Sequence, residues 1–216
     1  MTLTDTHDLR PLLAARDLVF ARDDEVVFGP LHLSVAAGDA LVVEGDNGSG
    51  KTTLLRVLAG LLEPSGGELE WRGAAFDASS REAGSIALLG HHLGLKSDLT
   101  PYENLCFRIG LTGLKSGSTP AAALRSVGLA GYEDVPVRSL SAGQRKRCAL
   151  AALLLCGASL WLLDEPYANL DREGRVLVDR MLETHRMRGG CVVLTSHGGQ
   201  STLSSCATLL LGGARR

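Results

Sequence analysis

Apolar and polar residues alternate along the first third of the chain in runs that predict strands, followed by a helix. Residues 15–35 contain two short alternating runs, LVF and EVVF…LHLSV, which are typical of antiparallel strands at the edge of a sheet. The run DALVVEG, at 39–45, has a continuous apolar centre and ends in glycine, as in a strand that is buried on both faces. Helical spacing follows in KTTLLRVLAGLL, at 51–62.

Strand and helix patterns continue to alternate over the rest of the chain. Residues 101–140 differ, because they hold helix-like segments broken by glycines and by Ser118-Thr119-Pro120, where Thr119 and Pro120 suit the N-cap and first position of a helix. This alternation predicts an α/β fold around a parallel sheet, with a helical insert between two strands. The other predicted elements are strands at GELEWRG, SIALLG, SLWLLDEP, CVVLTSH and ATLLLGG, a helix from Ser141 and a helix near 172–188.

Composition places the chain among ordinary soluble globular proteins. It has 216 residues, of which 45% are hydrophobic and 21% are charged, and its net charge is −2. That length is enough for one domain with a real core and an appendage. A nucleic-acid partner is not expected, because phosphate neutralisation needs clustered excess Lys and Arg, and aromatic residues for base stacking are only 4%.

The five cysteines indicate the redox compartment of the protein, and the longest apolar run indicates whether it spans a membrane. An odd cysteine count without a CxxC pair predicts a reducing compartment rather than a disulfide framework or a zinc site, with Cys148 and Cys156 as core residues. The N-terminal MTLTDTHDLR lacks the apolar stretch of a signal peptide. Residues 148–163 are shorter than the ~20 residues of a membrane span and are interrupted at Gly157, which predicts a buried helix and then a buried strand. We therefore expect no direct membrane span.

A phosphate-binding loop is predicted where the first buried strand meets the first helix. The stretch GDNGSGKTT fits the pattern G-x-x-x-x-G-K-[ST] in the strand-to-helix context that the motif requires. Glycines let backbone N–H groups surround a phosphate, and the helix N-terminus adds positive charge. Lys51 is expected to reach the β- and γ-phosphates of ATP and Thr52 to bind Mg²⁺; a glycine-rich turn with a chance lysine is the alternative. The predicted nucleotide-binding residues here are Gly45, Asp46, Asn47, Gly48, Ser49, Gly50, Lys51, Thr52 and Thr53.

A second predicted strand supplies two carboxylates. Four apolar residues in LWLLDEP lead to Asp164 and Glu165 at the carboxyl end of the strand. Asp164 is expected to hold Mg²⁺, directly or through water, and Glu165 to act as the general base or to position the attacking water. The alternative is a pair of acidic residues that only cap a following helix.

The stretch LSAGQRKR, at 140–147, resembles the signature of ATP-binding-cassette (ABC) ATPases, which is usually written LSGGQ. The resemblance covers nearly the whole chain, because YANLD (167–171) and LTSH (194–197) follow in the family's order. It implies a homodimer in which two ATP molecules lie between the subunits. Ser141, Gly143 and Gln144 of one subunit would then face the nucleotide held by the other. It also implies that His197 contacts the γ-phosphate and that Asp171 helps to couple the two sites.

The stretch LGHHLGLKSDLTPYENL, at 89–105, most resembles one subfamily, the ATP-binding subunit of the haem exporter of bacterial cytochrome c maturation. In this resemblance His92 takes the place of a glutamine that touches Mg²⁺, so we expect His92 to act at the catalytic cluster; the alternatives are loop packing and a surface ligand for metal or haem. The chain departs from the family at Ala142, Ala168 and Asn169. Where an aromatic residue usually stacks on adenine the chain has Arg22, with Phe20 and Phe28 as neighbours.

The resemblance implies a P-loop NTPase, with a RecA-like parallel sheet core, antiparallel N-terminal strands and a small helical subdomain. We expect one ABC ATPase domain over 1–216, with the core at 1–95 and 157–216 and the helical subdomain at about 96–156. A separate integral membrane subunit would hold it peripherally on the cytoplasmic face of the inner membrane, where ATP hydrolysis drives haem export or release of a haem chaperone. Another cargo, such as a lipoprotein or peptide, is the alternative, and a soluble ABC ATPase acting on DNA or ribosomes is a further one.

Overall fold

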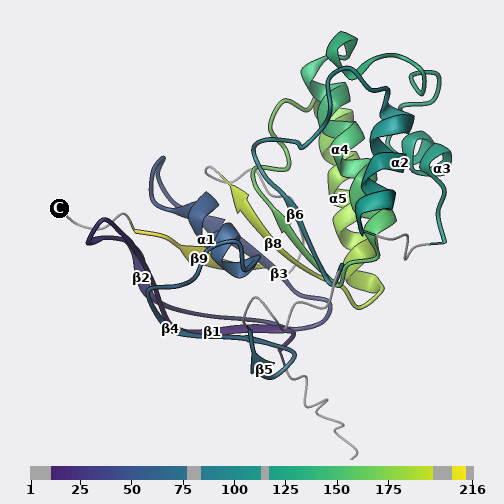
Figure 1. The fold of residues 1–216 in the computed structure, drawn as a ribbon. Helices are drawn as coiled ribbons and strands as arrows, with labels where there is room; N and C mark the ends of the chain where they lie inside the picture. Colours follow the sequence, from purple (N-terminus) through teal and green to yellow (C-terminus); the bar gives the residue numbers. More distant parts are fainter. Residues whose placement is uncertain (1–10, 77–83, 113–116, 197–205, 213–216) are drawn as a thin grey trace, which may run out of the picture.

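The computed structural model describes residues 11–76, 84–112, 117–196 and 206–212, which form two sheets and a group of helices (Figure 1). An antiparallel sheet has the strand order β2-β1-β4-β5, and a parallel sheet has the order β6-β7-β8-β3-β9. The strands are β1 (Leu13–Arg22), β2 (Glu25–Val35), β3 (Ala40–Glu44), β4 (Gly66–Trp71), β5 (Ala74–Ala75), β6 (Ile86–Leu89), β7 (Leu160–Leu163), β8 (Cys191–Ser196) and β9 (Ala207–Leu210).

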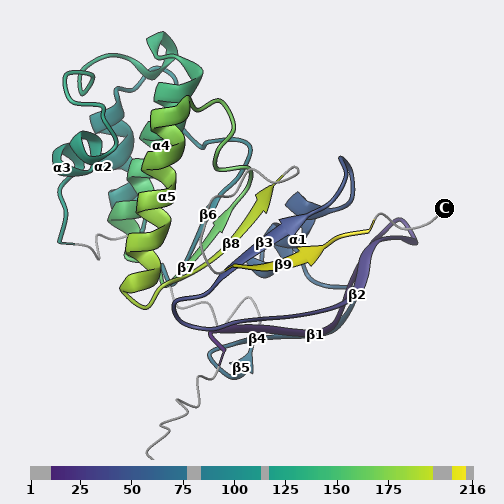
Figure 2. The ribbon, with the colours of Figure 1, turned by 180° about the vertical axis from the view of Figure 1, so that it is seen from behind.

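The helices divide between the two faces of the parallel sheet. α1 lies between the two sheets, whereas α4 and α5 cover the other face, and α2 and α3 pack against α4 (Figures 1 and 2). The helices are α1 (Lys51–Leu58), α2 (Pro101–Thr112), α3 (Pro120–Ser126), α4 (Ala142–Cys156) and α5 (Arg172–Met187), with a 3₁₀ turn η1 (Val137–Ser139) before α4. The segment between β6 and β7 therefore carries α2, α3 and α4 together.

The core has two halves, one on each face of the parallel sheet. In β3, Val42 faces the half built with α4 and α5, whereas Leu41 and Val43 face the half built with α1 and the antiparallel sheet. Successive side chains of a strand point to opposite faces, so a sheet that is covered on both sides needs apolar residues at every position. This is why the central strands appear in the sequence as continuous apolar runs.

The α/β class, the parallel sheet and the antiparallel N-terminal strands are confirmed, and two details differ. The helix predicted over 51–62 ends at Leu58, because Ala59 caps it and Gly60 takes the left-handed φ of 62°. The two-residue strand β5 was not predicted. The predicted cap at Thr119 is confirmed, since its side chain accepts a hydrogen bond from the backbone N–H of Ala122.

The apolar run at 148–163 is a buried helix followed by a buried strand, as predicted. α4 ends at Cys156, and Gly157 turns the chain with a left-handed φ of 61° before β7 begins. Cys148 is buried, and burial raises the pKa of its thiol to about 12, whereas Cys156 is only half-buried. Within the described ranges, none of the helices has the length and apolar character that crossing a bilayer demands.

Candidate functional site

The phosphate loop joins β3 to α1 and depends on its glycines. Gly48 and Gly50 adopt left-handed φ values of 82° and 95°, so that Gly50 turns the chain directly into Lys51, the first residue of α1. A Cβ atom added at Gly45 would lie 2.4 Å from the carbonyl oxygen of Leu211, and therefore only glycine fits there. The first N–H groups of α1 have no acceptor within the helix, which makes this turn an anion-binding site.

Lys51 lies in this loop with only 7% of its surface exposed. Its Nζ donates hydrogen bonds to the carbonyl oxygens of Gly45, at 2.6 Å, and Asp46, at 2.8 Å. A hollow of about 340 Å³ opens beside it, and its lining includes Asn47, Gly48, Gly50, Lys51, Thr52, Thr53, Arg22, Val27 and Glu165. The structure thus brings the phosphate loop and Glu165 to one hollow.

Asp164 joins three elements at the carboxyl end of the parallel sheet. Its Oδ2 accepts a hydrogen bond from the Thr52 hydroxyl in α1, at 2.8 Å, and its Oδ1 accepts one from the Thr195 hydroxyl in β8, at 2.7 Å. Asp164 is 5% exposed, so both oxygens act in a largely water-free setting. The predicted metal-binding pair, Thr52 and Asp164, is therefore in direct contact.

Glu165 follows with a backbone conformation that is rare outside glycine, at a φ of 47°. Its N–H donates to the Thr195 hydroxyl, at 2.9 Å, and its carbonyl oxygen accepts from Nζ of Lys146 in α4, at 3.0 Å. Sequence reasoning missed both partners. Thr195 is the next-to-last residue of the apolar strand β8, and Lys146 follows the signature. Neither position by itself indicates a contact with Glu165.

The signature residues gather at a different hollow. Ser141 caps α4, the helix predicted to start at this residue. Its hydroxyl accepts from the Gln144 N–H at 3.1 Å, while the Gln144 side chain accepts from the Ser141 N–H at 2.9 Å. The hollow, of about 480 Å³, is lined by Gly128, Tyr132, Ser141, Gly143, Gln144, Arg147, Asn169, Leu170 and Asp171. Among the described residues, it shares no lining residue with the hollow at Lys51.

Asp171 bridges this hollow and α5. Its carboxylate accepts from the Gly174 N–H at 2.8 Å and pairs with Arg147 at 3.0 Å. The N–H of Gly174, followed by the Arg147 guanidinium, holds the pKa of Asp171 below its ordinary value, although burial opposes this. Arg147 was not among the predicted site residues.

Comparison with known proteins agrees with this arrangement of phosphate loop, carboxylates and signature. A family model described as "ABC transporter" matches residues 28–168. This chain belongs to the ABC transporter family. The structure resembles that of a putative ABC transporter (ATP-binding protein) from Pyrococcus furiosus, with a TM-score of 0.78 and 26% identity over 92% of this chain and 96% of that one.

The chain is also similar to individual ABC proteins over most of its length. It is 56% identical to the cytochrome c biogenesis ATP-binding export protein CcmA of Xanthomonas axonopodis pv. citri (strain 306), over 89% of each chain. It is 44% identical to the protein of the same name from Methylococcus capsulatus (strain ATCC 33009 / NCIMB 11132 / Bath), over 92% of this chain and 97% of that one. The subfamily inferred from the sequence is therefore confirmed at the level of these relatives.

The two adjacent histidines of this ABC chain share a hollow with Thr52 and Asp164, the predicted metal-binding pair. A hollow of about 230 Å³ is lined by Thr52, Leu55, Arg56, Leu88, Gly90, His91, His92, Leu93, Gly94, Arg108 and Asp164. The rings of His91 and His92 are exposed and meet edge to face, with centroids 5.8 Å apart. His92 thus shares a hollow with Thr52 and Asp164, whereas His197 lies outside the described residues.

The residues near the expected adenine-stacking position, Arg22, Phe20 and Phe28, lie in different surroundings. Phe20 and Phe28 stack on each other with ring centroids 6.0 Å apart, and both are buried in the core between the sheets. Neither ring is among the residues that line the hollow beside Lys51. Arg22 and Val27 do line it, and Val27 was not predicted.

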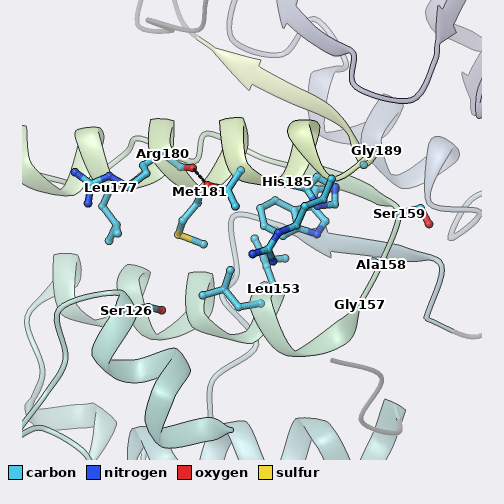
Figure 3. A pocket seen from close by; sticks show the side chains of 15 residues that line it. Ser126, Leu153, Gly157, Ala158, Ser159, Leu177, Arg180, Met181, His185 and Gly189 are labelled. Atoms are coloured by element: carbon cyan, nitrogen blue, oxygen red, sulfur yellow. Dashed lines mark hydrogen bonds between the residues drawn. The ribbon is translucent and has the colours of Figure 1, made fainter. Parts of the chain in front are cut away.

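A separate hollow of about 420 Å³ lies between α4, α5 and the start of β7 (Figure 3). Trp161 and His185 stack there with ring centroids 3.9 Å apart and planes 7° from parallel. A Cβ at Gly190 would lie 2.3 Å from the His185 ring, so glycine lets the ring stay on the tryptophan. Asp164 follows the opposite end of β7, which separates this hollow from the nucleotide site.

Proposed function

We propose that this chain is the ATP-hydrolysing subunit of an exporter in cytochrome c biogenesis, and that its cargo is haem or a haem chaperone. ATP binding and hydrolysis accord with its membership of the ABC transporter family. The export role comes from the names of relatives that are 44% to 57% identical over about nine-tenths of the chain. Another cargo, such as a lipoprotein or peptide, is the alternative reading.

The observation that carries the proposal is the contact of Thr52 with Asp164 beside the phosphate loop. Residues 112 positions apart meet at 2.8 Å, and Glu165 lines the same hollow as Lys51. Lys51 would reach the terminal phosphates, and Gly45, Asp46, Asn47, Gly48, Ser49, Gly50 and Thr53 would surround them. Glu165 would take a proton from the attacking water or orient that water toward the γ-phosphate.

Magnesium fits the donors at this place. The Thr52 hydroxyl and the Asp164 carboxylate are hard oxygen ligands within one hydrogen-bond length of each other. These two residues would hold the ion, and when bound it would neutralise charge on the phosphates.

His92 and His197 are proposed to complete the catalytic cluster. His92 lines the hollow that Thr52 and Asp164 also line, which supports a role close to the metal. Neutral imidazole can accept a hydrogen bond from a metal-bound water, as the glutamine of the family would. We expect His92→Gln to keep turnover and His92→Ala to lose it. Unchanged turnover in His92→Ala would remove this residue from the site. His197, whose role rests on the resemblance alone, would contact the γ-phosphate.

We propose that two copies of the chain form the working unit, each completing the other's site. Ser141, Gly143, Gln144 and Asp171 lie at a hollow distinct from the one at Lys51, so within one chain they do not surround the same phosphate. A head-to-tail pair would place the capped N-terminus of α4 over the partner's nucleotide. A separate integral membrane subunit would hold the pair on the cytoplasmic face of the inner membrane.

Two experiments test this function. Glu165→Gln should lower ATP turnover by orders of magnitude while the chain still binds a fluorescent ATP analogue. Mixing Lys51→Ala with Ser141→Arg should restore one complete site per heterodimer and hence part of the activity. Normal turnover in Ser141→Arg alone would rule out the composite site.

Cargo is tested in cells that lack the gene. Complementation with wild type should restore covalent haem in c-type cytochromes, whereas Glu165→Gln should not. Wild-type levels of covalent haem in the cells without the gene would contradict the role in cytochrome c biogenesis.

A further inference from the structure

Lys146 is a buried lysine of the signature helix, and its side chain contacts the backbone of Glu165. Only 5% of its surface is exposed, and its Nζ donates to the carbonyl oxygen of Glu165 at 3.0 Å. Burial lowers the pKa of Lys146, while the negative charges of Asp164 and Glu165 act to raise it. A buried lysine is costly unless hydrogen bonds or negative charges offset its desolvation. Here the carbonyl oxygen of Glu165 accepts from its Nζ, and the charges of Asp164 and Glu165 act on it.

The contact acts on a residue whose backbone is strained. Glu165 has a φ of 47°, a conformation that persists in a non-glycine residue only when its surroundings hold it. Thr195 accepts from its N–H at 2.9 Å, and Lys146 donates to its carbonyl oxygen at 3.0 Å. Hydrogen bonds to β8 and from α4 thus hold the backbone of Glu165 at its N–H and at its carbonyl oxygen. Together they fix the direction in which the Glu165 side chain points.

We infer that Lys146 is a positioning residue that holds the backbone of Glu165 in the conformation needed for hydrolysis and thereby ties it to the signature helix. This inference rests on the proposed role of Glu165. Ser141, which caps the helix, precedes Lys146 by about 7.5 Å along the axis, at 1.5 Å per residue. In the proposed dimer, any displacement of α4 by the partner's nucleotide would reach Glu165 through this lysine, so the state of one site would be transmitted to the other.

The test compares ATP turnover and ATP binding in purified full-length variants. Lys146→Met should lower kcat at least about tenfold with the KM for ATP within about threefold, since the phosphate loop is untouched. Lys146→Arg, which keeps a donor and a charge, should recover most of the turnover. Lys96→Met is the matched control, because Lys96 is exposed and outside the site; its kcat should equal that of wild type.

Folding is followed by thermal unfolding, so that positioning can be told from structural support. Methionine fills a similar volume without a buried charge, and Lys146→Met should therefore unfold no earlier than wild type despite its low kcat. Should Lys146→Met not fold, Lys146→Leu, which also lacks a hydrogen-bond donor, takes its place with the same expected loss of kcat. Turnover within about twofold of wild type in the folded variant, or equal losses in turnover and ATP binding, would overturn the inference.

Glu165→Gln, run in parallel, separates this inference from the proposed function. An inactive Glu165→Gln with a fully active Lys146→Met means that Glu165 is catalytic and that Lys146 does not position it. An active Glu165→Gln means that the proposed role of Glu165 is wrong, and the positioning role of Lys146 falls with it. An inactive Glu165→Gln with a slow, folded, ATP-binding Lys146→Met supports both.

Discussion

Replacing Thr195 with valine isolates the hydrogen bonds that join β8 to the two carboxylates. Thr195 is fully buried, donates to Asp164 at 2.7 Å and accepts from the Glu165 N–H at 2.9 Å. Valine has nearly the same shape, so the packing is kept while both hydrogen bonds are lost. The bond to the carboxylate contributes about 1.5–3 kcal/mol, and an amide that loses its partner costs about 1–3 kcal/mol.

The expected change in the free energy of unfolding is the sum of these two losses minus one gain. Valine has no hydroxyl to desolvate, which offsets about 1 kcal/mol on the scale of protein mutations. The free energy of unfolding should therefore fall by roughly 1.5–5 kcal/mol. For a chain of 150–250 residues, this corresponds to a decrease in Tm of roughly 3–20 °C.

Thermal unfolding, followed by circular dichroism, measures the effect directly. Thr195→Ser is the control, because it keeps the hydroxyl and loses one methyl group, at a cost of about 1 kcal/mol. Turnover of ATP should also fall in Thr195→Val, since both Asp164 and Glu165 lose a fixed contact. If Thr195→Val unfolds within about 2 °C of wild type, the network does not stabilise the fold and the reasoning fails.

Three further outcomes are expected. Gly45→Ala should destabilise the chain and abolish ATP binding, because its Cβ would lie 2.4 Å from the Leu211 carbonyl oxygen, and a variant that still binds a fluorescent ATP analogue would refute this. Burial lowers the pKa of His185 below its ordinary value of 6.5, so on acidification the unfolded chain binds a proton more readily than the folded chain. The free energy of unfolding, measured in urea, should therefore fall as the pH drops from 7 to below 6, and it should fall less in His185→Phe. Maleimide should label the exposed Cys106 in the native chain but reach the buried Cys148 only after unfolding, as mass spectrometry of tryptic peptides can establish.

Local patterns were enough to predict the elements and the phosphate loop. The phosphate loop at 45–50, between a buried strand and a helix, and caps such as Thr119 and Ser141 are built from contacts within a few positions of the chain. Such contacts depend on backbone geometry and side-chain type, which the sequence states directly. The end of the first helix was predicted less accurately, because two local signals competed there. Helical spacing of apolar residues continued to 62, but Gly60 allowed the chain to turn after Leu58.

Contacts between distant segments were decided only by the tertiary structure. Parallel strands bring their carboxyl ends to one edge, and this geometry places Thr52, Asp164 and Thr195 within hydrogen-bond distance although they lie on α1, after β7 and on β8. No local pattern marks Lys146 as a partner of Glu165, because the direction of its side chain depends on how α4 packs against the sheet. By itself the sequence determined which chemical groups the site contains. Packing determined which of them touch, since a hydrogen bond depends on distances that spacing along the chain does not specify.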